Sequence, residues 1–157
     1  MRDFDLSIVR NVECEMDDDF FNAVVKETVS LCGMPSLSVS ADVSVGMALV
    51  SDEEIRELNR VYRDKDAPTD VLSFSEHEGE EIGPDSDGRI FLGDLVISPS
   101  FVRRAAETDS VPFQKELAFV CSHGTLHLLG FDHSEEMFRI QDEVTELVTM
   151  AETVYPL

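Results

Sequence analysis

Three of the four histidines in this chain lie between positions 123 and 133, and their spacing is the feature that most constrains the fold. His123 and His127 are four residues apart, so on a helix they lie on the same face, one turn from each other. Gly130 follows, and glycine readily takes the left-handed conformation that ends a helix. We therefore expect the chain to turn at Gly130 and to bring His133 back toward the other two imidazoles.

Three imidazoles without a fourth protein ligand are typical of a catalytic zinc site, in which the open position holds water. The competing interpretation is that these histidines are packed and hydrogen-bonded in the core. One histidine alone favours that interpretation, but three at this spacing, with a glycine at the turn, favour metal. The sequence predicts one Zn²⁺ ion bound by His123, His127 and His133.

The spacing is also that of the metzincin proteases, H-E-x-x-H-x-x-G-x-x-H, with one change. Gly124 stands where those enzymes carry the glutamate that acts as general base. A peptidase would lack its central catalytic group. Because a metal ion alone lowers the pKa of bound water to about 7, the pattern still allows hydrolysis of another kind.

The run HGTLHLLGFDH, residues 123–133, resembles the signature of the YbeY family, bacterial endoribonucleases of ribosomal RNA maturation. Two further blocks, Leu58–Phe74 and Leu92–Ser98, resemble that family's second and third blocks. The similarity extends from about Leu49 to His133, with the blocks in family order.

This resemblance implies a zinc-dependent, single-strand-specific endoribonuclease in ribosomal RNA maturation and ribosome quality control. It implies that Arg63 lies near the metal. It also implies single-stranded RNA, a ribosomal RNA precursor, as substrate, and small-subunit ribosomal proteins and an assembly GTPase as partners, with no DNA. The start of the chain has no apolar leader and no apolar run approaches membrane-spanning length, so we expect a cytoplasmic protein that binds no membrane.

Three other residues could take part in the chemistry, and the sequence leaves their roles open. From the residues alone, Arg63 could equally donate two hydrogen bonds to a phosphate or complement the negative end of its own helix. The family resemblance favours the phosphate contact, so Arg63 is the predicted catalytic residue. Glu116 lies on the histidine face of the helix, as an orienting group, a distant base or an ordinary surface glutamate. Asp132 could orient a ligand or cap the next helix.

The net charge of −21 argues against nucleic-acid binding through the overall field of the protein. Any contact with RNA has to be local. Arg56, Arg60 and Arg63 share one face of a predicted helix and form the one basic stripe in the sequence. The three cysteines are widely spaced and indicate reduced core residues of a cytosolic protein.

Strand patterns early in the chain and helix patterns later predict an α+β fold with a small mixed sheet of about four strands and about five helices, zincin-like by the resemblance. The length predicts one domain over residues 1–157. The predicted strands cover Phe4–Val9, a long segment from Leu37 to Leu49 that breaks near Asp42 or Gly46, Val71–Ser75 and Arg89–Ser98. The predicted helices begin at Asp17, Asp52, Pro99 and Pro112, with a last one that turns Met137, Ile140, Val144, Leu147, Val148 and Ala151 inward.

Two alternatives come from other functional classes. One is a metal-dependent hydrolase of a different substrate, including peptides. The other is a ribosome-assembly binding module in which zinc only holds the fold. A fourth protein ligand would distinguish the second alternative, and Asp132 and Cys121 are the candidates. Cys121 precedes His123 by two residues, so a helix directs the two side chains apart.

Overall fold

The structure, a computed structural model, describes residues 1, 3–34, 37 and 41–154, the last five by their backbone alone. These residues form an α+β fold of four strands and five helices, which confirms the predicted class. In chain order the elements are β1 (Asp3–Arg10), α1 (Asp18–Leu31), β2 (Asp42–Leu49), α2 (Asp52–Arg63), β3 (Val71–Ser75), β4 (Arg89–Ile97), α3 (Pro99–Asp109), α4 (Phe113–Leu128) and α5 (Glu135–Val154).

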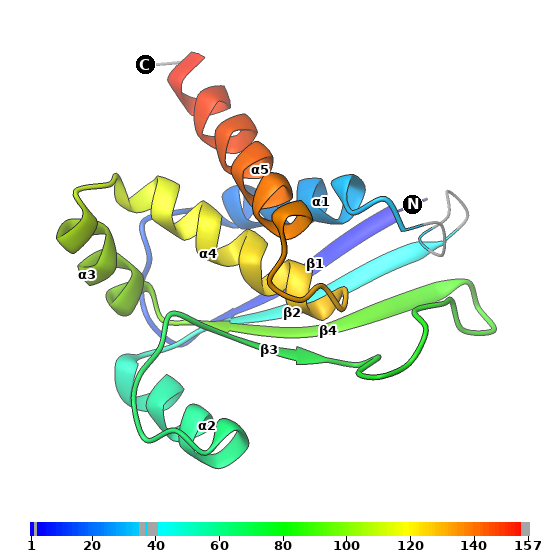
Figure 1. The fold of residues 1–157 in the computed structure, drawn as a ribbon, viewed down its shortest axis with the longest axis horizontal. Helices are drawn as coiled ribbons and strands as arrows, with labels where there is room; N and C mark the ends of the chain where they lie inside the picture. Colours follow the sequence, from blue (N-terminus) through cyan, green and yellow to red (C-terminus); the bar gives the residue numbers. More distant parts are fainter. Residues whose placement is uncertain (2, 35–36, 38–40, 155–157) are drawn as a thin grey trace.

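The sheet has the strand order β1-β2-β4-β3. β1 pairs with β2 and β2 with β4 in parallel, whereas β3 runs antiparallel to β4. Helices α1, α3, α4 and α5 lie on one face of this sheet, and α2 lies on the other (Figure 1). The main core fills the space between the sheet and the first group of helices.

α4 is the central helix of that layer and packs against α1, α3 and α5 as well as the sheet. It is apolar on nearly every side, as expected for a helix with neighbours all round. Its burial fixes the position of any side chain that it carries.

Gly93 marks a bulge in β4. Ser44 of β2 pairs with Phe91 and Gly46 pairs with Asp94, so β4 carries one extra residue between these pairs. Gly93 has a φ of 133°, and a side chain there would collide with the carbonyl oxygen of Phe74. Only glycine allows β3 to approach β4 this closely.

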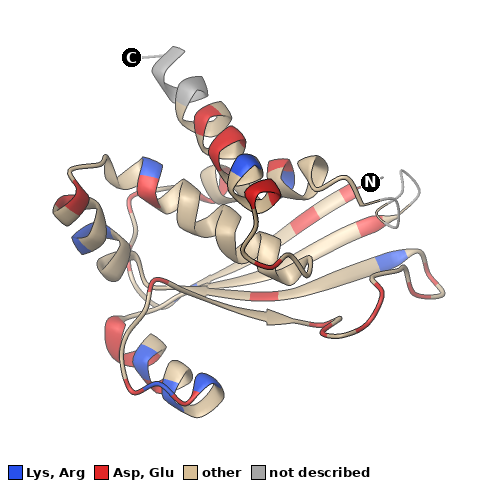
Figure 2. Cartoon of the chain, viewed as in Figure 1, with Lys and Arg blue, Asp and Glu red and all other residues tan. Residues whose placement is uncertain are grey.

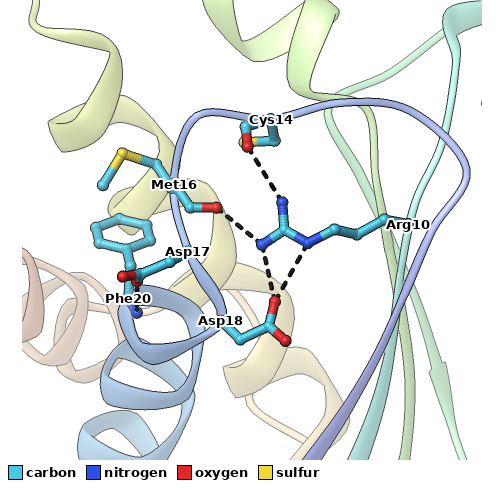
Figure 3. A network of polar contacts seen from close by, with 6 residues as sticks. All are labelled: Arg10, Cys14, Met16, Asp17, Asp18 and Phe20. Atoms are coloured by element: carbon cyan, nitrogen blue, oxygen red, sulfur yellow. Dashed lines mark hydrogen bonds and ion pairs between the residues drawn. The ribbon is translucent and has the colours of Figure 1, made fainter.

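The helix starts follow the sequence closely. The side chains of Asp17, Ser51 and Ser98 accept hydrogen bonds from the first turns of α1, α2 and α3. Figure 3 shows how Arg10 secures the loop before α1, because its guanidinium donates to the carbonyls of Cys14 and Met16 and to the Asp18 carboxylate.

Two details differ from the sequence-based expectations. β2 begins at Asp42, one of the two places where the long segment was predicted to break, but Leu37 lies in a bend and not in a strand. Residues 38–40 lie outside the described part of the chain. Leu147 was expected to face inward but is 49% exposed, because it lies off the buried stripe of α5. Ala151 belongs to the residues described by backbone only.

α2 is held against the far face of the sheet by a small second core. Ile55 packs there with Val50, Leu72 and Val96. At its start, Asp52 accepts a hydrogen bond from Ser98 and pairs with Arg104 at 2.7 Å. At its end, the buried Asn59 side chain donates to the carbonyl of Ala67. These ties fix the position of Arg63, the last residue of the helix.

Among the described residues, no helix combines the length and the apolar character that a membrane crossing needs.

Candidate metal centre and its cleft

The three histidines meet at the C-terminal end of α4, as their spacing predicts. One ring nitrogen of each histidine lies within 4.8 Å of the other two. His123 and His127 are half-buried on α4, with their Nε2 atoms 2.9 Å apart, and His133 is exposed in the loop that follows.

A turn centred on Gly130 brings in the third histidine. Gly130 has a φ of 87°, and its N–H donates to the carbonyl of His127 while the Phe131 N–H donates to that of Leu126. These two bonds form a Schellman motif, which reverses the chain at a helix end. Ser134 then caps α5, because its Oγ accepts a hydrogen bond from the Met137 N–H. The sequence left open whether Asp132 caps this helix, and Ser134 takes that role instead.

The turn also orients His127. Its Nδ1 lies 3.0 Å from the carbonyl oxygen of Phe131. A carbonyl oxygen only accepts hydrogen bonds, so Nδ1 carries the proton and Nε2 keeps its lone pair. A lone pair on Nε2 directed at the cluster is what a metal ligand requires.

The donor set fits a metal ion. A tetrahedral zinc with Zn–N bonds of ~2.0–2.1 Å separates its ligand nitrogens by about 3.3 Å. This separation lies between the 2.9 Å of the His123–His127 pair and the 4.8 Å that bounds the cluster. Among the described residues, no cysteine or carboxylate joins the three histidines. Burial raises the pKa of the Cys121 thiol to about 12, which keeps it protonated and makes it a poor ligand. Burial, with the charge of His127, lowers the pKa of His123 and favours its neutral, metal-binding form.

Two serines of β3 hold α4 in place. Ser73 Oγ donates to the carbonyl of Gly124 at 2.9 Å, and Ser75 Oγ donates to that of Leu128 at 3.2 Å. Two residues span ~6.6 Å along a strand and four residues span ~6.0 Å along a helix, so both bonds form at once when α4 lies along β3. Ser75 thereby satisfies a last-turn carbonyl that the helix itself leaves free.

Gly124 is where α4 touches the sheet. A Cβ atom at this position would lie 2.9 Å from a methyl carbon of Leu95 and 2.9 Å from one of Val71. The position that holds the general base in metzincins therefore faces a packed sheet here, with no room for a glutamate.

Arg63, the last residue of α2, lines the same cleft as the three histidines. Its guanidinium donates to the Ser73 carbonyl at 2.7 Å and to the Tyr62 carbonyl at 3.3 Å, and it stacks on Phe74 at 5.1 Å. Within the described part of the chain the structure pairs it with no carboxylate. The basic stripe is otherwise neutralised, because Arg56 pairs with Asp66 and Arg60 with Glu57.

The histidines and Arg63 line one cleft of about 1430 Å³. Glu116 also lines it, and burial together with nearby acidic residues raises the pKa of its carboxyl. Asp132 lines it but lies outside the histidine cluster. Figure 2 shows basic segments gathered on α2, opposite the acidic loop between β3 and β4. Among the residues that line the cleft, Arg63 and Lys65 are basic, whereas Asp70, Glu78, Glu80, Glu81, Glu116 and Asp132 are acidic.

Sequence reasoning missed the residues that support the site. Ser73 belongs to the matched family block Leu58–Phe74 and Ser75 directly follows that block, but only the strand register shows that they reach α4. Gln141 contacts His123, with its Nε2 3.1 Å from His123 Nδ1. A signal existed for it, because Gln141 and Thr145 are polar residues at core-facing positions of α5.

The family model described as Endoribonuclease YbeY matches residues 8–149. The chain is 41% identical over 130 residues to an Endoribonuclease YbeY of Desulforamulus reducens, covering 82% of this chain and 84% of that protein. It is 39% identical over 142 residues to one of Bacillus cereus, covering 84% and 88%. The solution structure of TM1509 from Thermotoga maritima is similar in fold, with a TM-score of 0.65, 30% identity and coverage of 96% and 93%.

Proposed function

This chain belongs to the endoribonuclease YbeY family, and we propose that it is a metal-dependent endoribonuclease that cleaves single-stranded RNA in ribosomal RNA maturation and ribosome quality control. Three imidazoles meet in one cleft, and Arg63 lines the same cleft without a carboxylate partner among the described residues. This is the observation that carries the proposal.

The proposed metal ligands are His123, His127 and His133, and the proposed ion is a single Zn²⁺. Imidazole nitrogens suit zinc, and a set of three leaves a coordination position for water or substrate. When bound, the ion supplies Lewis-acid polarisation at the scissile phosphate or at water. No cysteine or carboxylate in the described part of the chain adds a fourth ligand to the cluster, which favours this role over a purely structural zinc.

Arg63 is the proposed contact for the scissile phosphate. A guanidinium has five N–H donors, and two of them bind the carbonyls of Tyr62 and Ser73, which leaves three for a ligand. Charge builds up on the non-bridging oxygens as the phosphodiester is attacked. A guanidinium held in place by Ser73 and Phe74 can donate to those oxygens without reorganising.

The charge distribution supports local recognition of one strand. Arg63 and Lys65 line one side of the cleft, and the acidic loop with Glu78, Glu80 and Glu81 lines another. The net charge of −21 opposes wide contact with a phosphate backbone. The same negative charge suits recruitment by basic partners. We propose small-subunit ribosomal proteins and an assembly GTPase as these partners, and we propose that the protein binds neither DNA nor membranes. The proposed site of action is the cytoplasm.

The experiment compares cleavage of one labelled RNA as a single strand, the same sequence as a duplex, and the matching single-stranded DNA. Each is incubated with metal-stripped protein, zinc-restored protein and zinc-restored His127→Ala. We expect cleavage of the single-stranded RNA by the zinc-restored wild type alone. Equal cleavage by the metal-stripped protein would contradict the role of the metal, and peptidase activity without RNA cleavage would favour another substrate.

A further inference from the structure

Gln141 on α5 is fully buried and points its side-chain amide at His123 in the cluster of three histidines. Its Nε2 lies 3.1 Å from His123 Nδ1, and its Oε1 is buried without a hydrogen-bond partner. A buried amide oxygen without a hydrogen-bond partner is destabilising, so such an atom calls for an explanation.

The hydrogen bonds of the cluster form a chain with one direction. His127 Nδ1 donates to Phe131, so His127 Nε2 has a lone pair and accepts from His123 Nε2, 2.9 Å away. His123 Nδ1 is then the unprotonated nitrogen and accepts from the Gln141 amide. Each ring N–H of His123 and His127 in this arrangement has an acceptor, but His123 Nε2 holds the proton.

Binding a metal reverses the direction at His123. A ligating nitrogen must offer its lone pair, so the proton of His123 has to move from Nε2 to Nδ1. An Nδ1–H needs an acceptor, and the nearest group is the Gln141 amide. A half-turn of that amide replaces the nitrogen with the oxygen that has no partner in the first arrangement.

We propose that Gln141 is a positioning residue for the metal ligand His123. Its side-chain oxygen accepts the Nδ1–H of His123 and holds the imidazole with Nε2 directed at the ion. Thr145 Oγ1 lies one turn further along the same face of α5 and is likewise buried without a partner among the described residues. This inference rests on the proposed function, because it concerns the ligand set of that site.

The test is a zinc titration of the full-length protein against a chromophoric chelator, with wild type, Gln141→Met and Gln141→Glu. Methionine keeps the length and burial but accepts no strong hydrogen bond, and we expect zinc affinity to fall about 10–100-fold. Glutamate keeps the acceptor, and its affinity should stay near or above that of the wild type. Gln141→Met that is folded and binds zinc as tightly as the wild type would overturn the proposal.

A control separates positioning from a general loss of stability. Thr28→Val removes the buried hydrogen bond between Thr28 and Ser122, which joins α1 to α4 without touching an imidazole. We expect this variant to lose stability and keep its zinc affinity. An equal loss of affinity in Thr28→Val and Gln141→Met would overturn a specific role for Gln141.

A measurement on the wild type needs no variant to fold. In ¹⁵N-histidine NMR spectra of the zinc-loaded protein, His123 should carry its proton on Nδ1, and that proton should exchange slowly because Gln141 holds it. A proton on Nε2, or fast exchange at Nδ1, would overturn the proposal. Failure of the wild type to bind zinc would instead overturn the proposed function, and the role of Gln141 with it.

Discussion

Ser73 Oγ donates a 2.9 Å hydrogen bond to the carbonyl of Gly124, and the carbonyl of Ser73 accepts one from Arg63. One residue of the edge strand β3 therefore connects the proposed phosphate contact to the helix that carries two metal ligands. The spacing between Arg63 and the cluster depends on how closely α4 packs on β3.

Gly124→Ala tests that packing. The added methyl group would meet Leu95 and Val71 at 2.9 Å, and overpacking of this kind costs ~1–3 kcal/mol. Alanine regains about 1 kcal/mol of helix propensity, so we expect a net loss of up to ~2 kcal/mol in the free energy of unfolding. Urea denaturation measures this loss, and a variant more stable than the wild type would contradict close packing at Gly124.

The pH dependence of Asp52→Asn tests the anchoring of α2. Hydrogen bonds from Arg104 and Ser98 hold the pKa of the Asp52 carboxyl below its ordinary value. A lowered folded-state pKa means that this stabilisation is present above the unfolded value of about 3.9 and is lost as the pH falls through the folded value. The difference in unfolding free energy between wild type and variant should therefore be largest at neutral pH and shrink in acid. A difference that grows below pH ~4 would contradict this account.

Much of the site was predictable because its geometry is local. The i, i+4 pair, Gly130 and His133 form one continuous segment, so helix periodicity and a glycine turn are enough to bring the imidazoles together. The capping residues Asp17, Ser51 and Ser98 act within one turn of their helices, and their roles follow from sequence for the same reason.

The supporting contacts were not predictable because they join distant segments. Ser73 meets Gly124 and Gln141 meets His123 only once the sheet order and helix packing are known. The basic stripe illustrates the same limit. Arg56, Arg60 and Arg63 share a helical face, but the partners Asp66 and Glu57 leave only Arg63 without a carboxylate among the described residues.

The salt dependence of RNA binding tests local recognition. If Arg63 and Lys65 are the cations that meet phosphates, about two counterions are released, and the slope of log K against log salt for a single strand should be about −1.4. Binding of a labelled strand between about 50 and 200 mM salt measures the slope, with catalytically inactive protein. Arg63→Ala should make it shallower by about 0.7. A slope steeper than about −4 would indicate a wide phosphate contact and contradict this assignment.

The most direct test of the central claim measures zinc content and single-turnover RNA cleavage together in the wild type, Arg63→Ala and Arg56→Ala. Arg56 is the matched control, because it lies on the same helix but pairs with Asp66. We predict one zinc per chain in all three, with wild-type cleavage in Arg56→Ala and a rate lower by about 10²–10³-fold in Arg63→Ala. Wild-type cleavage by zinc-loaded Arg63→Ala would contradict the claim that the three histidines and Arg63 form one active site.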